Sequence, residues 1–218
     1  MVGIDLSPVQ PRWVPPNCQF QIDDIEAEWT YPLPSTDPSS ELDHGSQNGG
    51  FDFIHCRMLG LGLKDWPNLF RQSFAHLRPG GFFEAQEFDL TVHCEPDSPK
   101  KGVAFRRWSD SVTAAARKAG IEATAPRRFP AQLQEAGFTD IQVKTVRWPV
   151  GPWPDGETKK KEKTLGLWAQ RNMLDGLEGA AMGLLSRYEG WSKEEVLELV
   201  KEARTECLDM EFHQYVNL

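Results

Sequence analysis

The alternation of strand and helix patterns over residues 51–88 constrains the fold of this chain most. Residues 51–55 have the apolar character of a buried strand, and residues 66–77 carry apolar side chains at the spacing of an amphipathic helix. Asp65 is positioned to cap that helix. A turn over residues 78–81 separates the helix from a second strand over residues 82–88. Strand, helix and strand in this order predict an α/β fold with a parallel sheet.

The rest of the chain extends this pattern on both sides. Short strands are expected at residues 2–4, 19–24 and 141–148, and helices at 103–119, 129–136, 165–188 and 192–210. Residues 89–101 are predicted to form a polar loop. Residues 32–50 are rich in proline, serine, glycine and aspartate, which is typical of a mobile loop. We therefore expect a single domain over residues 1–218, in which residues 89–136 and 152–210 are cap or helical segments.

Composition narrows the classes of function. The chain has a net charge of −8, which argues against a nucleic-acid surface, and no apolar run reaches the roughly 18 residues of a membrane span. No secretory signal pattern is present. The cysteines form neither a CxxC pair nor a zinc pattern, and we interpret them as free thiols: Cys18, Cys56, Cys94 and Cys207. These features predict an intracellular protein, in the cytoplasm or the nucleus, with no metal, nucleic-acid or membrane partner.

Polar side chains stand at the ends of three expected strands. Asp5 ends the first, Asp23 and Asp24 end the second, and His55-Cys56-Arg57 ends the third. Ligands of an open parallel sheet bind beyond the carboxyl ends of its strands. A carboxylate there accepts hydrogen bonds from two vicinal ribose hydroxyls or from an exocyclic adenine amine. A single acid at a strand end also serves as a cap of a turn or helix, so acids at two successive strand ends are the more specific signal.

Taken in order, these motifs resemble those of a known family. The segments Val2–Pro8, Asp23-Asp24, Phe51–His55 and Leu77–Phe82 match the post-I, II, IV and VI motifs of class I S-adenosylmethionine (SAM) methyltransferases. Narrower matches resemble the LaeA-like methyltransferases of filamentous fungi: Ser7–Asn17, Asp65–Pro67, Gln86–Asp89, Glu135–Phe138, Gly190–Ser192 and His213–Tyr215. The resemblance covers nearly the whole chain apart from the 32–50 segment.

The resemblance implies a Rossmann-like fold, in which a seven-stranded sheet is flanked by helices and carries an added cap. It implies that SAM is the cofactor and that its methyl group is transferred to an acceptor. The family acts in fungal secondary metabolite biosynthesis or in its regulation. The implied partner is accordingly a small-molecule acceptor or a regulatory protein.

The resemblance also implies roles for individual residues by their position in the motifs. Asp5 would bind the ribose and Leu6 would flank the adenine, while Asp24 and Ile25 would hold the adenine. The third strand end would face the methionyl and methyl end of SAM through His55, Cys56 and Arg57.

Among these residues His55 is the best candidate for a general base, because imidazole titrates near neutral pH. A histidine at a strand end serves equally as a structural hydrogen-bonding group. Arg57 is a candidate either to orient an anionic acceptor or to pair with a loop acid. Further candidates for the cleft are His93, His213, Trp13 and Trp108. For the two tryptophans the alternative is packing in the core.

Two features of the family do not occur in this sequence. No strand with a glycine-rich loop, the family's motif I, precedes Val2, and the sequence stops at Leu218, before the family's last strand. Motif I wraps the methionyl part of SAM, and its strand is central in the sheet. We therefore expect an N-terminally truncated family member with an incomplete parallel sheet, from which the first and last strands are missing. The alternative function is a non-catalytic methyltransferase-like remnant, or a partner-binding pseudoenzyme without the glycine-rich SAM loop.

Overall fold

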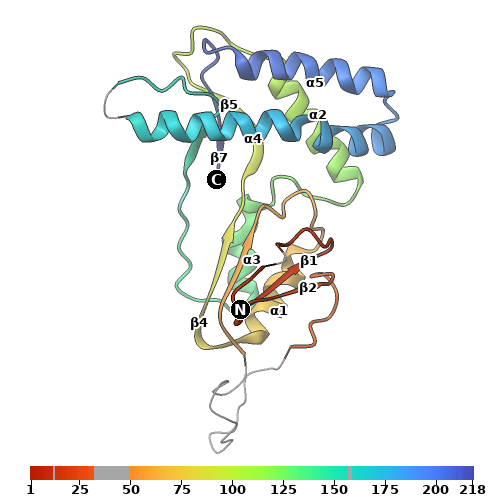
Figure 1. Cartoon of the computed structure of the whole chain (residues 1–218), viewed down its shortest axis with the longest axis vertical. Helices are drawn as coiled ribbons and strands as arrows, with labels where there is room; N and C mark the ends of the chain where they lie inside the picture. Colours follow the sequence, from red (N-terminus) through yellow and green to blue (C-terminus); the bar gives the residue numbers. More distant parts are fainter. Residues whose placement is uncertain (12, 32–49, 157–158) are drawn as a thin grey trace, which may run out of the picture. The chain divides into compact units, whose positions relative to one another are not determined.

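The computed structural model describes residues 1–11, 13–31, 50–156 and 159–218, which form two compact units (Figure 1). Unit 1 contains residues 1–55, 65–84 and 131–141, and unit 2 contains residues 56–64, 85–130 and 142–218. The loop expected at residues 32–50 lies outside the described residues, apart from Gly50.

Unit 1 begins with a parallel pair of strands, β1 (Val2–Asp5) and β2 (Gln19–Ile22). Their register pairs Asp5 with Ile22, and the N–H of Asp23 donates to the carbonyl of Asp5 at 3.1 Å. Strands β3 (Phe51–Arg57) and β4 (Leu77–Gln86), which start in unit 1, pair in a separate sheet. Among the described strands β1 does not pair with β3. The α/β class is therefore as the sequence predicts, and the parallel pairing that it predicts is present between β1 and β2.

Helix α1 (Trp66–His76) begins where its sequence predicts. The side chain of Asp65 accepts a hydrogen bond from the N–H of Asn68 at 2.8 Å. Pro67 occupies the first turn, where a backbone N–H has no helical partner to lose. The local sequence thus fixes the start of α1.

Aromatic side chains join α1 to its neighbours in unit 1. Phe70 of α1 contacts Phe83 of β4 edge to face, with ring centroids 5.5 Å apart. Phe138, which follows helix α3 (Phe129–Ala136), contacts both Phe83 at 5.6 Å and Phe74 of α1 at 5.2 Å. Between α3 and Phe138 lies Gly137, at which a Cβ atom would approach the Phe74 ring to 2.8 Å. A glycine is required there because the aromatic packing leaves no space for a side chain.

Unit 2 contains an antiparallel sheet in the order β5-β7-β6. Its strands are β5 (Asp89–Cys94), β6 (Arg147–Pro149) and β7 (Gln214–Asn217). The polar loop predicted at residues 89–101 is thus wrong over β5, and the strand predicted at 141–148 is a strand only from Arg147. Nor did the sequence pattern predict a strand after the last helix. The reason is that β5 pairs with residues more than a hundred positions away, which no local pattern records.

Four helical segments of unit 2 pack around this sheet. They are α2 (Ala104–Lys118), α4 (Lys160–Leu184), the single π-helical turn η3 (Leu185–Glu189) and α5 (Lys193–Leu208). A short 3₁₀ helix, η1 (Ala125–Arg128), precedes α3. Ser192 and Glu195 form the expected capping box at the start of α5.

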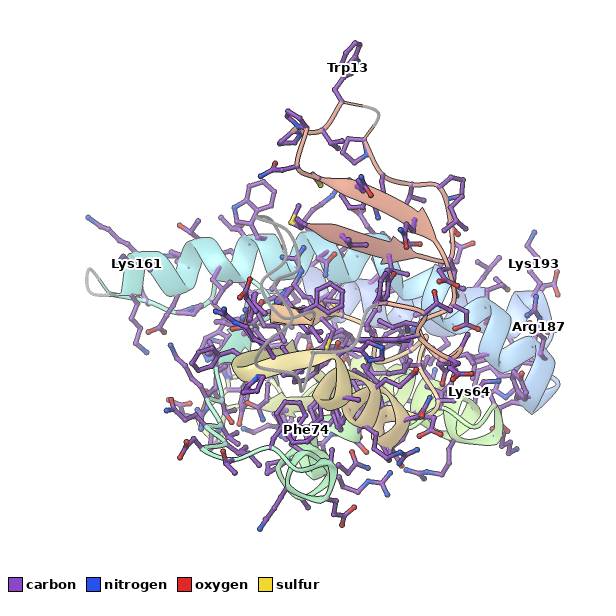
Figure 2. The ribbon with its side chains drawn as sticks, turned by 90° about the horizontal axis from the view of Figure 1, so that it is seen from below. Trp13, Lys64, Phe74, Lys161, Arg187 and Lys193 are labelled. Atoms are coloured by element: carbon purple, nitrogen blue, oxygen red, sulfur yellow. The ribbon has the colours of Figure 1, made fainter. Side chains whose placement is uncertain are left out.

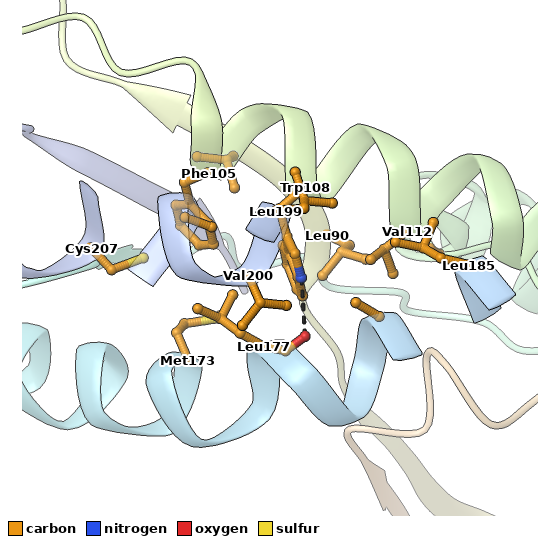
Figure 3. Close-up of a cluster of buried hydrophobic side chains, with 14 of the residues drawn as sticks. Leu90, Phe105, Trp108, Val112, Met173, Leu177, Leu185, Leu199, Val200 and Cys207 are labelled. Carbon is orange, nitrogen blue, oxygen red and sulfur yellow. Dashed lines mark hydrogen bonds between the residues drawn. The ribbon is translucent and has the colours of Figure 1, made fainter. Parts of the chain in front are cut away.

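The core of unit 2 lies between α2, α4 and α5 (Figure 3). Trp108 of α2 is 2% exposed, and its indole N–H donates to the carbonyl of Leu177 on α4 at 3.0 Å. Val112, Leu177 and Leu199 are likewise buried around it. Of the two readings of Trp108, packing in the core is therefore confirmed.

The N-terminus of α2 is capped from another helix. Val103, at the cap position, offers no side-chain hydrogen bond. The carboxylate of Glu206 on α5 accepts instead from the N–H groups of Val103, Ala104 and Phe105, at 2.9, 2.8 and 3.0 Å. Helix N-termini leave their first N–H groups without partners and attract negative charge. Glu206 thus ties α5 to α2 across about a hundred residues of sequence.

We expect Glu206→Ala to lower the free energy of unfolding by about 1–3 kcal/mol, because it leaves three backbone donors without their acceptor. The control is Glu198→Ala on the same helix, where an exposed ion pair with Lys201 is lost at a cost of up to about 0.5 kcal/mol. Urea denaturation measures both. Equal stability of the two variants would contradict the capping role.

Candidate functional site

The expected acids stand together at the carboxyl edge of the β1–β2 pair. Asp5 ends β1, and Asp23 and Asp24 directly follow β2. One carboxylate oxygen of Asp5 accepts from the N–H of Ser7 at 2.9 Å, and one of Asp24 accepts from the N–H of Glu26 at 2.9 Å. Within the described residues no hydrogen bond reaches the second oxygen of either group. Each side chain is thus oriented by its own turn and keeps an acceptor for a ligand.

The segment after β2 is anchored on helix α1. Glu26 accepts a hydrogen bond from the N–H of Asp65, the α1 cap residue, at 2.8 Å. Gln72 of α1 accepts from the N–H of Trp29 at 2.8 Å, and the indole of Trp29 donates to the carbonyl of Ile25 at 3.0 Å. Sequence reasoning did not find the two anchors to α1, because each joins a backbone N–H to a side chain about 40 residues away. They hold the half-buried Ile25 at the end of β2.

The connection between β1 and β2 is exposed. Leu6 is 68% exposed and Trp13 is 95% exposed, and Figure 2 shows the Trp13 side chain pointing away from the strands. Core packing is thus wrong for Trp13. Leu6 directly follows Asp5, and its apolar side chain is exposed to solvent.

His55 on β3 pairs with an acid on the neighbouring strand. Its Nδ1 atom lies 2.8 Å from a carboxylate oxygen of Glu84 on β4. A carboxylate at Nδ1 favours the tautomer in which that nitrogen carries the proton and Nε2 remains an acceptor. This contact fits both readings of His55, as a base oriented by Glu84 and as a structural hydrogen-bonding group.

The two residues after His55 belong to unit 2 and differ in exposure. The side chain of Cys56 is buried, at 6% exposure, and that of Arg57 is exposed. Within the described residues no ion pair involves Arg57, so the pairing with a loop acid is not found there. That Cys56 and Arg57 face the methyl donor remains a prediction.

The other two candidate histidines lie in unit 2 and stack on aromatic rings. His93 is on strand β5 and not on a loop, and its ring stacks on Tyr215 of β7 with centroids 5.1 Å apart. His213 stacks on Trp153 at 4.8 Å. No disulfide joins any of the four cysteines, all of which lie among the described residues.

Glu87 is a buried acid whose role the sequence reasoning missed. It is 5% exposed, and its two carboxylate oxygens accept from the N–H groups of Leu59 and Gly60, at 2.8 and 3.1 Å. Glu87 therefore holds the loop that follows β3. Burial raises the pKa of its carboxyl group from 4.5 to about 7, although the two N–H groups act in the opposite direction. The available signal was an acid within the otherwise strand-like stretch that precedes Phe88.

We expect stability to fall as the pH rises from about 4.5 to about 7. In this range folded Glu87 keeps a proton that the unfolded chain has released, so raising the pH favours unfolding. The drop should be about 3 kcal/mol and should level off above the folded pKa. Glu87→Gln should remove this part of the pH dependence.

Urea denaturation of both proteins between pH 4.5 and 8 measures the effect. The two proteins differ only at residue 87, so the difference between the two curves isolates Glu87. The exposed Glu198→Gln serves as the control and should retain the slope of the unaltered chain. A Glu87→Gln protein with that same slope would contradict the assignment.

The described residues contain neither a helix that could span a membrane nor a cluster of metal ligands. No helix in this part of the chain is long and apolar enough to cross a membrane. Nor does this part contain a group of three or more histidine, cysteine or acidic side chains placed to hold a metal ion.

Comparison with known proteins places the chain among methyltransferases. Residues 1–143 match the family described as "Methyltransferase domain". The chain is 33% identical over 213 residues to the methyltransferase pytC of Aspergillus terreus, which covers 98% of this chain and 60% of pytC. It is 34% identical over 218 residues to the secondary metabolism regulator laeA of Monascus pilosus, covering 99% of this chain and 54% of that protein.

A third relative is the protein-methionine methyltransferase laeA of Emericella nidulans, at 32% identity over 217 residues, 99% of this chain and 53% of that protein. The chain thus spans about half to three fifths of the length of these relatives. The family match supports SAM as the cofactor. Together these matches show that the chain belongs to the methyltransferase-domain family, in its LaeA-like class I branch.

Proposed function

We propose that this chain binds SAM and transfers its methyl group, in fungal secondary metabolite biosynthesis or in its regulation. One observation carries the proposal: two acids with unused carboxylate oxygens stand side by side at the carboxyl edge of a parallel strand pair, in a chain of the methyltransferase-domain family. The relatives support it, since their names describe a methyltransferase, a regulator of secondary metabolism and a protein-methionine methyltransferase.

The residues at this edge fit the adenosine half of SAM. The second carboxylate oxygen of Asp5 would accept from the ribose hydroxyls, and that of Asp24 from the adenine amine. Leu6 and Ile25 would cover the faces of the base with apolar surface. Because the turn at Ser7 already orients Asp5, little side-chain freedom is lost on binding.

SAM supplies a methyl group that is already activated on sulfur, so the protein's task is to orient the acceptor and exclude water. We propose His55 as the group that takes a proton from an acceptor that carries one, with Glu84 as the positioning residue that fixes its tautomer. Arg57 would orient an anionic acceptor, and Cys56 would stand near the methyl end.

The remaining features of the proposal concern the whole protein. The two units would act as one methyltransferase domain, with residues 89–136 and 152–210 as its cap. The acceptor would be a small molecule or a regulatory protein, and not a nucleic acid or a membrane. We place the protein inside the cell, in the cytoplasm or the nucleus, since its four cysteine thiols form no disulfide.

Isothermal titration with SAM and with S-adenosylhomocysteine tests the proposal. We expect both to bind, and we expect Asp5→Asn to weaken binding by about ten- to a hundredfold, because the hydrogen bonds from the ribose then lose their charged acceptor. Asp110→Asn, at an exposed position on α2, is the matched control and should bind like the unaltered chain.

Failure of both ligands to bind would contradict the proposal and would favour a non-catalytic partner-binding protein. Binding that Asp5→Asn and Asp110→Asn leave equally strong would show that the ribose is held elsewhere.

A further inference from the structure

A hollow of about 740 Å³ lies within unit 2. Its volume is in the range of small-molecule sites. Its lining comes from strands β6 and β7, from the segment after β5, from Trp153–Asp155 and from Lys159, Glu162 and Leu165. We call it the β6–β7 groove. None of the acids at the end of β1 or β2 belongs to it.

The aromatic wall of the groove is held in place by its neighbours. Trp153 stacks on His213 with ring centroids 4.8 Å apart and an angle of 14° between the rings. The indole N–H of Trp153 donates to the carbonyl of Gln214 at 2.9 Å. The next residue, Pro154, is fully buried. Since both its edge and its stacked face are fixed, the indole ring is preorganised.

A close backbone contact fixes the segment that leads to this wall. The N–H of Gly151 donates to the carbonyl of Gly166 in α4 at 3.1 Å. A Cβ atom at Gly166 would lie only 2.1 Å from the Gly151 carbonyl oxygen. The two glycines therefore let the chain pass directly over the first turns of α4, and this places Trp153 at the groove.

The groove already holds one cation against an aromatic ring. The guanidinium of Arg147 lies 4.8 Å from the centroid of Tyr215 and forms an ion pair with Glu95 at 3.0 Å. This arrangement, a cation between a ring and a carboxylate, is the geometry that stabilises organic cations in proteins. Arg147 and Glu95 neutralise each other.

The remaining charges of the lining favour a cationic ligand. Besides Glu95, three carboxylates line the groove: Asp97, Asp155 and Glu162. Among the described residues of the lining, the lysine and arginine side chains are those of Lys159 and Arg147. The N–H of Gly156 donates a hydrogen bond to Asp155, and the positive charge of Lys163 lies nearby. Both lower the pKa of Asp155, so its carboxyl group is ionised at neutral pH. Within the described residues no ion pair involves Asp97 or Glu162.

We propose that the β6–β7 groove binds an organic cation of the substituted-ammonium class, with the Trp153–His213 stack as its aromatic platform and Asp97 and Glu162 as its counter-charges. A quaternary ammonium group suits this site because its spread charge is weakly hydrated and contacts a ring face without losing hydrogen bonds. The cation could be carried by a free small molecule or by a modified lysine side chain, since both present the same group.

Titration with choline, followed by the indole ¹H–¹⁵N resonance of Trp153, tests the proposal. The resonance is assigned as the one that disappears in Trp153→Phe. The neutral isostere 3,3-dimethyl-1-butanol has the same shape as choline without its charge. We expect choline to shift the resonance with saturation, and we expect the isostere to bind at least about tenfold more weakly.

The double variant Asp97→Asn with Glu162→Gln should weaken choline binding about tenfold. The matched control, Glu178→Gln, changes an exposed acid elsewhere on α4 and should leave the affinity unchanged. A short capped peptide with one trimethyl-lysine distinguishes the two sources: it binds more tightly than choline if the groove takes a side chain, and no more tightly if it takes a small molecule.

Three results would overturn the proposal: no saturable shift, equal affinity for choline and its isostere, or unchanged affinity in the double variant. The assay needs neither SAM nor methyl transfer, so its failure is distinct from failure of the proposed function.

Discussion

The parallel pairing of β1 with β2 is the constraint on which the proposed cofactor site depends. The register that sets Asp5 opposite Ile22 brings Asp5 beside the Asp23–Asp24 pair at one sheet edge. Side chains alternate between the faces of a strand, so a slip of one residue would turn every side chain of β2 to the other face. The anchors from Glu26 and Trp29 to α1 oppose such a slip, because they fix where the chain leaves β2.

In unit 2 the corresponding constraint is the contact between helices that are distant in sequence. Glu206 of α5 caps α2, and the indole of Trp108 on α2 bonds to a carbonyl of α4. Each of these polar groups is satisfied inside or beside an apolar core, which specifies one arrangement of the three helices. The β6–β7 groove depends on α4 as well, since the close approach of Gly151 to Gly166 fixes the segment that leads to Trp153.

Local signals predicted the features that depend on few neighbouring residues. The Asp65 cap, the Ser192–Glu195 capping box and the bounds of α3 follow from sequence because each arises within one helical turn. The motifs likewise identified the acids at the ends of β1 and β2. The strand at Asp89–Cys94, the cap from Glu206 and the partner of His55 depend on long-range pairing, and nothing near them in sequence specifies those partners. Glu87 was missed because an acid within a strand-like stretch does not by itself reveal its distant partners, the N–H groups of Leu59 and Gly60.

Comparing adenosine with 2′,3′-dideoxyadenosine tests most directly whether the β1–β2 edge is the adenosine site. The readout is the set of backbone amide resonances at residues 5–7 and 24–26, measured by NMR during each titration. We predict that adenosine shifts both sets. Loss of the ribose hydroxyls abolishes the shifts at Asp5 and Ser7, which report on the Asp5 carboxylate, while those at Leu6 and at residues 24–26 remain. Equal shifts with both compounds, or shifts confined to other parts of the chain, would contradict the account.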